Sequence, residues 1–172
     1  MKSIARYLVV AFTLVCCVGC DQVSKSAARA FLAPGIRESL LGDSLRLQLV
    51  ANPGSLLSLG ASLPEHLRFV LFTGAVAVLL IGVVSAALFA RSFDAARFLG
   101  LALVAGGGIS NLLDRLMYQG RVTDFLNVGV GSLRTGIFNL ADMTILAGAL
   151  LVLLKQRAAS TAADHRGTPP QP

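Results

Sequence analysis

Four long apolar stretches alternate with polar segments along the 172 residues of this chain. The stretches run over residues 7–19, 69–90, 98–113 and 135–154. A helix of about 20 apolar residues crosses the roughly 30 Å hydrocarbon core of a bilayer. The pattern therefore predicts an all-α membrane protein with four transmembrane helices, and an even number of crossings puts both termini on one side of the membrane.

The first and third stretches carry further signals. The first can continue as a helix through residues 21–32. The third contains Gly106, Gly107 and Gly108, and small residues in a membrane helix let neighbouring helices approach closely. We therefore expect a long first helix and close packing around the third.

Three polar segments connect the stretches. Residues 33–67 are rich in Gly, Pro and Ser, and the alternation in their SLRLQLV segment indicates a short strand. Residues 91–97 predict a tight charged turn, and residues 118–134, interrupted by glycines, predict a strand or an interfacial helix. We expect residues 1–157 to form one membrane domain and residues 158–172 to be a disordered tail.

Composition supports a membrane protein, because 55% of the residues are hydrophobic and 14% are charged, against about a quarter charged in soluble domains. The net charge of +6 comes from single Lys and Arg residues without a basic stripe, which argues against a nucleic-acid partner. A raw count of basic residues does not separate the two sides. Those at the termini and in residues 91–97 lie closest to span ends, so we place these segments in the cytoplasm.

Acidic residues lie where charge is costly. The chain has nine Asp and Glu, and Asp21, Asp114, Asp124 and Asp142 occupy or adjoin apolar stretches. A charged side chain at the centre of a membrane helix costs about 2.5 to 3.5 kcal/mol on insertion scales, so such residues are usually functional. The predicted topology gathers all four acids near the outer face of the membrane.

Helical spacing groups polar residues around two of these acids. Asn111 shares a helix face with Asp114 and Arg115, three and four residues later, and we expect Asp114 to orient Arg115. Asn139 and Asp142 are also three apart. A capping role suits Asn139 but not Asp142, which comes too late in the apolar stretch. Simpler alternatives are headgroup contacts for the first group and a packing ion pair for Asp142.

Asp124 and Asp142 are candidates for a carboxylate pair. Two carboxyl groups held a few ångströms apart cannot both ionise, so one keeps a proton. Such a pair can polarise a carbonyl and deprotonate water, which hydrolyses a bond without a covalent intermediate. GxSxG and HExxH motifs are absent, the two His residues are isolated, and we expect no metal or cofactor. Asp21 and Lys25 are four residues apart, in the favourable order for a helical ion pair. Spacing leaves open whether this pair, and the turn at Asn52 and Gly54, are structural or take part in the chemistry.

The chain resembles the lipoprotein signal peptidase family (signal peptidase II, prolipoprotein signal peptidase) over roughly residues 5–155. Five motifs in order carry the resemblance: DQVSK (21–25), NPGS (52–55), GGGISNLLDR (106–115), VTDF (122–125) and FNLADM (138–143). It implies a membrane aspartyl endopeptidase of the bacterial inner membrane that cleaves prolipoproteins before a diacylglyceryl-modified cysteine. Asp124 and Asp142 would be the catalytic pair.

The resemblance also implies supporting residues and an outer structure. Residues that would line or brace the site are Asn52, Gly54, Asn111, Asp114, Arg115, Asn139, Asp21 and Lys25. Residues 33–66 and 118–134 would form a small extracytoplasmic sheet and a short interfacial helix. Globomycin-like peptides would inhibit the protein, and we expect a monomer. The continuation LLSLG after NPGS, and Ala51 where an acid is common, depart from the family and concern the substrate clasp.

Two alternatives are open. A proton-coupled transporter would use intramembrane Asp residues, but a proton relay should spread acids across the membrane depth rather than gather them at one face. Alternatively, residues 1–19 could be a lipoprotein signal peptide removed before a lipidated Cys20. Gly19 fits that motif, Cys17 fits it less well, and cleavage would leave the DQVSK motif without its helix.

Overall fold

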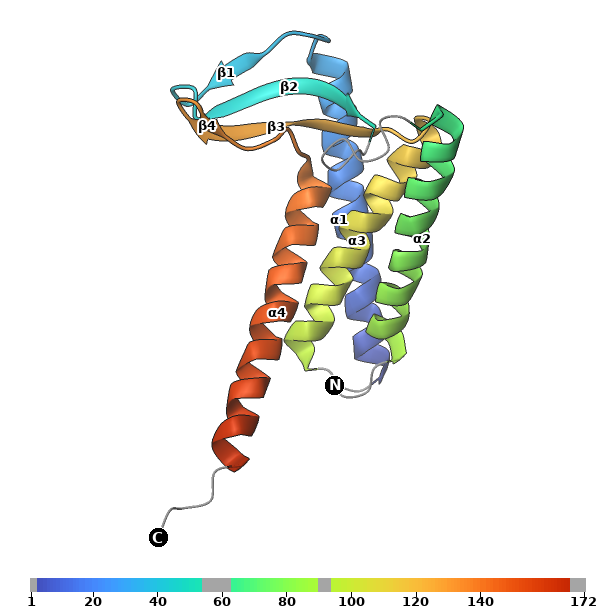
Figure 1. Ribbon diagram of the computed structural model, residues 1–172, viewed down its shortest axis with the longest axis vertical. Helices are drawn as coiled ribbons and strands as arrows, with labels where there is room; N and C mark the ends of the chain where they lie inside the picture. The colour runs from blue at the N-terminus through green and yellow to red at the C-terminus, as the bar shows by residue number, and fades with distance from the viewer. Residues whose placement is uncertain (1–2, 54–62, 90–93, 168–172) are drawn as a thin grey trace.

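A computed structural model describes residues 3–53, 63–89 and 94–167. Four helices form a bundle with a small sheet across one end (Figure 1). The helices are α1 (Ser3–Phe31), α2 (Glu65–Phe89), α3 (Ala95–Met117) and α4 (Leu140–Gly167). The strands are β1 (Glu38–Leu40), β2 (Leu45–Asn52), β3 (Val122–Val130) and β4 (Leu133–Arg134).

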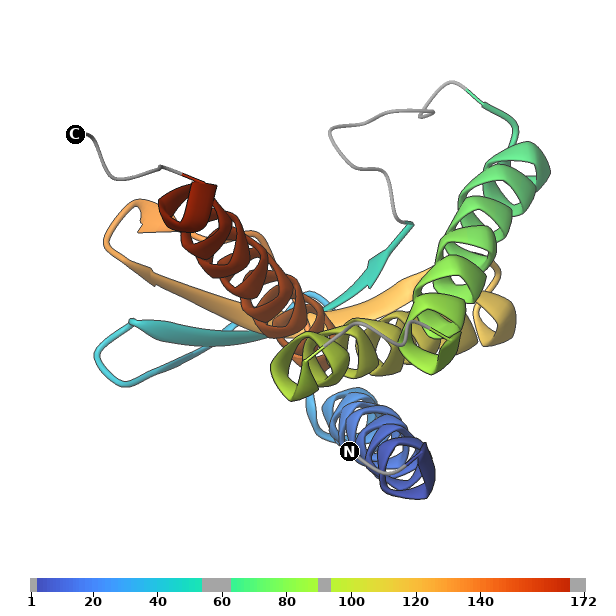
Figure 2. The same cartoon turned by 90° about the horizontal axis from the view of Figure 1, so that it is seen from below.

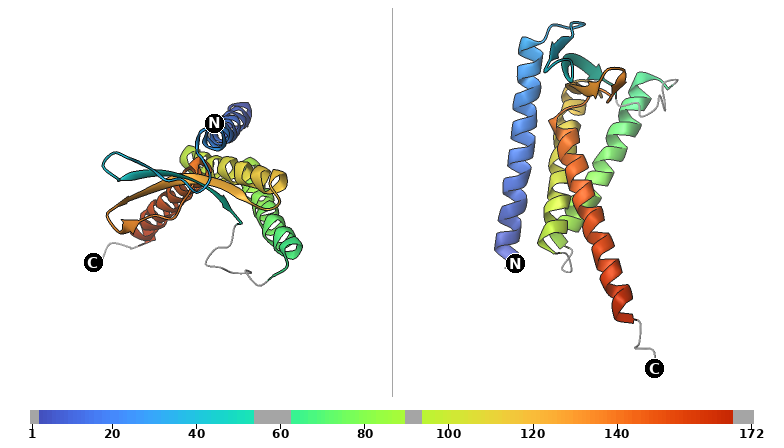
Figure 3. Two further views of the ribbon diagram at one scale, coloured as in Figure 1. Left: turned by 90° about the horizontal axis from the view of Figure 1, so that it is seen from above. Right: turned by 90° about the vertical axis from the view of Figure 1, so that its left-hand side faces the viewer.

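Three of these helices are long and apolar enough to cross a membrane: α1 from Ile4, α2 as far as Ala86, and α3. Helix α4 is as long, but it has Asp142 in its first turn. Helix α1 begins, and α4 ends, at the end of the bundle away from the sheet (Figures 1 and 3). The predicted extension of the first helix past residue 21 is confirmed, and α1 ends at Phe31, one residue before the predicted end at 32.

Helix α3 packs against each of the other three helices, as the view from below shows (Figure 2). Residues 106–108 explain how. A Cβ atom on these three glycines would lie between 2.4 and 2.7 Å from Cys17 of α1, Ala141 of α4 and Leu80 of α2, respectively. Side-chain carbons do not approach other atoms this closely, so a neighbour would have to shift. The backbone oxygen of Ala141 and the Cβ of Cys17 cannot move easily, which requires glycine at 107 and 106, whereas at 108 the end of the flexible Leu80 side chain could move aside. The close packing expected from the three glycines is confirmed.

The four strands pair antiparallel in the order β1-β2-β3-β4. The central pair places Val50 of β2 opposite Asp124 of β3, and a register irregularity lies between Leu47 and Val50. The strand predicted within residues 44–50 is therefore confirmed. Residues 118–134 form strands rather than an interfacial helix. The described residues contain no such helix, and residues 54–62 lie outside them.

The start of α4 differs from the predicted start at residue 135. Residues before Leu140 are extended, because Phe138 forms an antiparallel bridge with Leu126 of β3. The bridge is long-range in sequence, so the apolar pattern could not indicate it. At its other end α4 continues to Gly167, ten residues past the predicted domain boundary at 157.

Candidate active site

Polar side chains from every layer of the fold meet where α1, α3, β3 and the start of α4 come together. The following side chains are less than a tenth exposed: Asp21, Lys25, Asn111, Asp114, Asp124 and Asn139. Asp142 and Arg115 are partly buried. Nine of the ten residues singled out in the sequence lie in this region, and Gly54 lies outside the described residues.

Asn139 connects the two candidate catalytic carboxylates. Its side-chain Nδ2 donates a hydrogen bond of 2.6 Å to Oδ1 of Asp124. Its backbone N–H donates a bond of 3.2 Å to Oδ2 of Asp142. Strand β3 and helix α4 thus bring two carboxyl groups that are 18 positions apart in the chain into hydrogen bonds with one residue.

The same residue caps the start of α4 at Leu140. The Asp142 N–H donates to Oδ1 of Asn139 at 2.9 Å, and the Asn139 N–H bonds back to the Asp142 carboxylate. This reciprocal pair is a capping box. The prediction that Asp142 lies too late to take part in capping is wrong, because the helix begins at Leu140 and not at 135. In the first turn its carboxylate also interacts favourably with the helix dipole.

Asp124 lies in β3 and is 2% exposed. Its Oδ2 accepts a hydrogen bond of 2.8 Å from Nδ2 of Asn52, in addition to the bond from Asn139. Burial raises the pKa of Asp124 to about 6, and the charge of Asp142 adds to the effect, while the two amide donors oppose it. A carboxyl group of this kind can hold a proton much closer to neutral pH than an exposed Asp.

Two other helices fix the position of the Asp142 carboxylate: Asn111 of α3 bonds to it, and Lys25 of α1 bonds to Asn111. Nδ2 of Asn111 donates to Oδ1 of Asp142 at 2.9 Å, while Oδ1 of Asn111 accepts a 2.8 Å bond from Nζ of Lys25. An ammonium group can only donate. Lys25 therefore keeps the oxygen of Asn111 on its own side and turns the amide donor toward Asp142.

Two buried carboxylates balance the charge of Lys25. Its Nζ lies 2.7 Å from Asp21 and 3.2 Å from Asp114, which confirms the ion pair expected from the spacing of Asp21 and Lys25. Asp21 also accepts bonds from Oγ of Ser110 and the N–H of Ala141, so it joins α1 to both α3 and α4. Removing one partner of such a buried pair usually costs about 3 to 5 kcal/mol.

Asp114 anchors neighbouring elements rather than orienting Arg115. It accepts bonds from Nε2 of Gln22 at 2.9 Å and from the N–H of Thr123 at 2.8 Å, besides its ion pair with Lys25. Arg115 instead donates from Nη1 to the carbonyl of Asn111 at 3.3 Å. Its guanidinium group is close enough to Asp142, Asp124 and Asp114 for their negative charges to act on it.

Sequence reasoning missed Gln22, Ser110 and Thr123. Gln22 donates hydrogen bonds to Asp114 and to Oγ of Ser110. The backbone N–H of Thr123, the residue before Asp124 in β3, also donates to Asp114. Gln22 is three residues before Lys25, so helical spacing could have placed both on one face of α1. The role of Thr123 depends on a contact between β3 and α3 that no local pattern indicates.

The arrangement can carry out acid–base hydrolysis. Asp124, whose pKa is raised, and Asp142 both accept hydrogen bonds from Asn139. Arg115 supplies positive charge beside them. This combination suits proton transfer to a carbonyl and from a water molecule.

Comparison with known proteins agrees with this site. The chain is 39% identical over 139 residues to the lipoprotein signal peptidase of Rhodococcus jostii (strain RHA1), which covers 78% of this chain and 65% of that protein. It is 31% identical over 172 residues to the lipoprotein signal peptidase of Polynucleobacter necessarius subsp. necessarius (strain STIR1), covering 96% and 100%. The chain thus spans just under two thirds of the first relative and the whole of the second.

Solved structures share the fold. A bacterial membrane enzyme has a TM-score of 0.73 at 19% identity, covering 98% of this chain and 94% of its own. A second bacterial membrane enzyme has a TM-score of 0.68 at 21% identity. The profile of the family described as signal peptidase (SPase) II matches residues 13–157, which is most of the chain. With these relatives and this profile, the chain belongs to the signal peptidase II family.

Proposed function

We propose that the chain is a membrane-embedded aspartic endopeptidase that removes signal peptides from prolipoproteins. It would cut before the diacylglyceryl-modified cysteine. The observation that carries the proposal is that the carboxyl groups of Asp124 and Asp142 both accept hydrogen bonds from Asn139. Membership of the signal peptidase II family supports the substrate class.

The environments of the two carboxyl groups suggest different roles. Burial favours a proton on Asp124, which would donate it to the carbonyl oxygen of the scissile peptide. Asp142, at a helix N-terminus and beside Arg115, would take a proton from the attacking water. The water oxygen bonds to the carbonyl carbon to give a tetrahedral intermediate with two hydroxyl groups. As the peptide bond breaks, Asp142 gives its proton to the leaving nitrogen and one hydroxyl of the intermediate returns a proton to Asp124, which restores both carboxyl groups.

The fold suits a substrate that arrives within the membrane. We place α1 to α4 across the inner membrane, with both termini in the cytoplasm and the sheet and carboxylate pair at the outer face. This placement rests on the apolar helices and on the basic residues near the span ends. Substrates would be diacylglyceryl-modified prolipoproteins, and globomycin-like peptides would compete for the same site on a monomer.

Cleavage of a lipidated prolipoprotein by the purified chain in detergent tests the proposal. Asp124→Asn and Asp142→Asn should each lower the rate at least about 100-fold, because acid–base groups typically contribute that much or more. Asp94→Asn is the matched control. Asp94 caps α3 by accepting a bond from the N–H of Arg97, and Asn caps equally well.

Full activity in either catalytic variant would contradict the assignment. If the wild-type chain released no peptide but moved protons across liposomes, the transporter alternative would replace it. The intact mass of the chain tests whether Cys20 is lipidated, because processing at that cysteine would remove residues 1–19 and add the mass of acyl chains. That loss would include Cys17, which packs against Gly106.

A further inference from the structure

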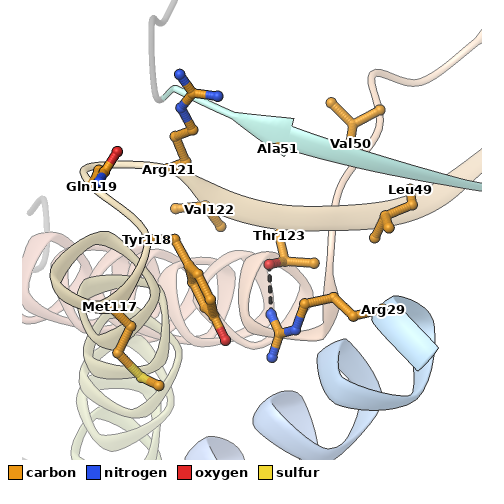
Figure 4. A pocket seen from close by; sticks show the side chains of 10 residues that line it. All are labelled: Arg29, Leu49, Val50, Ala51, Met117, Tyr118, Gln119, Arg121, Val122 and Thr123. Atoms are coloured by element: carbon orange, nitrogen blue, oxygen red, sulfur yellow. Dashed lines mark hydrogen bonds between the residues drawn. The ribbon is translucent and has the colours of Figure 1, made fainter. Parts of the chain in front are cut away.

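A cavity of about 470 Å³ lies between the end of α1, the end of α3 and strands β2 and β3 (Figure 4). Successive residues of a strand point to opposite faces. Thr123 accordingly points to Arg29 in this cavity, whereas Asp124 points to Asn52 and Asn139. The cavity is therefore separate from the carboxylate pair.

Arg29 places a fixed positive charge in this cavity. Its Nη1 donates a 2.7 Å hydrogen bond to Oγ1 of Thr123, and its guanidinium carbon lies 4.7 Å from the centre of the Tyr118 ring. Figure 4 shows the Arg29 and Tyr118 side chains entering the same space from α1 and from the end of α3. Both contacts orient the guanidinium group, but neither neutralises it. Within residues 3–53, 63–89 and 94–167, no carboxylate forms an ion pair with Arg29.

Much of the cavity lining is apolar and continues onto the exposed surface of the helix ends, although Gln119 and Arg121 also line the cavity and Arg121 pairs with Glu65. Leu49, Met117 and Val122 line the cavity. Met117 is 64% exposed, and the neighbouring large apolar side chains of Leu116 and Phe31 are 59% and 83% exposed. These residues end α1 and α3 where the bundle meets the sheet, which is the level of lipid headgroups in the proposed membrane placement. A fixed cation above an apolar surface matches an amphiphile with a small anionic head.

We propose that this cavity binds the headgroup of an anionic membrane phospholipid. The phosphodiester would sit on Arg29, whose planar guanidinium group matches phosphate geometry. The acyl chains would run down past Met117 along the exposed ends of α1 and α3. The site is distinct from the proposed proteolytic centre and does not depend on that activity.

Native mass spectrometry of the full chain, released from nanodiscs with equal amounts of phosphatidylglycerol and phosphatidylethanolamine, tests the proposal. The wild-type chain should retain phosphatidylglycerol in preference. Arg29→Gln should lower this preference by about five-fold, the factor that one basic residue contributes near an anionic headgroup. Arg29→Lys should keep part of it, because the charge stays while the planar fork is lost.

Arg37→Gln is the matched control, because it removes the same charge from an exposed position at the same end of the bundle, outside the cavity. It should leave the preference unchanged. An equal loss in both glutamine variants, or no loss in Arg29→Gln, would overturn the proposal. The proposal would also be overturned if lipid-free protein bound inorganic phosphate in an Arg29-dependent way and added phosphate displaced phosphatidylglycerol from the lipid-bound protein. The site would then take the free anion.

Discussion

Asn139 has two roles at the scale of single residues. Its side-chain oxygen caps α4, and its side-chain nitrogen holds Asp124. The cap of α4 and the contact with Asp124 therefore depend on different atoms of one amide. Substitutions that keep one function and remove the other can separate the two effects.

Asn139→Ser should separate them. Serine caps helices about as well as asparagine, so this variant should keep the cap. Its melting temperature should fall only by the cost of the lost amide donor, which also bonds to the side chain of Asn111 and the carbonyl of Thr123. The bond to Asp124 requires an amide nitrogen, so the cleavage rate should fall at least ten-fold. Asn139→Ala, measured in parallel, should lose activity and also about 1 kcal/mol of stability with its cap. A fully active serine variant would contradict the proposed role of this amide.

The pKa of Asp124 predicts a pH dependence. If Asp124 must carry a proton, kcat/KM should fall as pH rises through about 6, the pKa set mainly by burial. The hydrogen bond from Asn52 lowers that pKa. Asn52→Ala should therefore raise the pKa and move the falling limb to higher pH.

Profiles of kcat/KM against pH for the wild type, Asn52→Ala and Gln48→Ala check this result. Gln48→Ala shortens an amide side chain on the same strand and should leave the falling limb in place. A limb that does not move in Asn52→Ala would show that a group other than Asp124 controls it.

At the scale of elements, α3 determines how the bundle packs. Its three consecutive glycines face three different helices, and a Cβ on Gly107 would lie 2.4 Å from the carbonyl oxygen of Ala141. That carbonyl belongs to the first turn of α4, next to Asp142. Helix packing and the position of Asp142, one of the two carboxylates proposed to be catalytic, are thus coupled.

In Gly107→Ala, the added methyl group should push α3 and α4 further apart. Overpacking of this kind costs about 1 to 3 kcal/mol, so the melting temperature in detergent should drop and activity should fall with it. Gly74→Ala is the matched control, because a Cβ there meets nothing within 4 Å. It should be neutral or slightly stabilising, since alanine favours a helix. Equal melting temperatures for the two variants would contradict this account.

Sequence patterns predicted elements better than their junctions. Apolar length and spacing identified the four helices, the strand around Leu47 and the pairing of Asp21 with Lys25. The start of α4 was misplaced because Phe138 pairs with β3 rather than continuing the apolar stretch. Such a bridge, like the bond from Thr123 to Asp114, joins distant parts of the chain and leaves no periodic signal.

At the scale of the whole molecule, the fold has two unlike ends. The sheet and the buried polar network lie at one end of the bundle, and α1 begins and α4 ends at the other (Figures 1 and 3). The proposed topology places the sheet outside the cytoplasm. This polarity can be tested independently of any enzymatic activity.

Reporter fusions give that test. A fluorescent protein that matures only in the cytoplasm should fluoresce when it is fused after Pro172. The same reporter inserted at Gly42, in the turn between β1 and β2, should not fluoresce. Fluorescence from the inserted reporter and not from the terminal fusion would reverse the proposed orientation.

The capping box has a consequence for the timing of turnover. Whenever Asp142 takes a proton from water, the acceptor that holds the N–H of Asn139 becomes weaker, so the first turn of α4 would loosen for as long as the intermediate lasts. Return of the proton to the leaving amine would tighten that turn again. Each cut would then be accompanied by a brief fraying of the helix, at the point where the outer sheet joins the bundle.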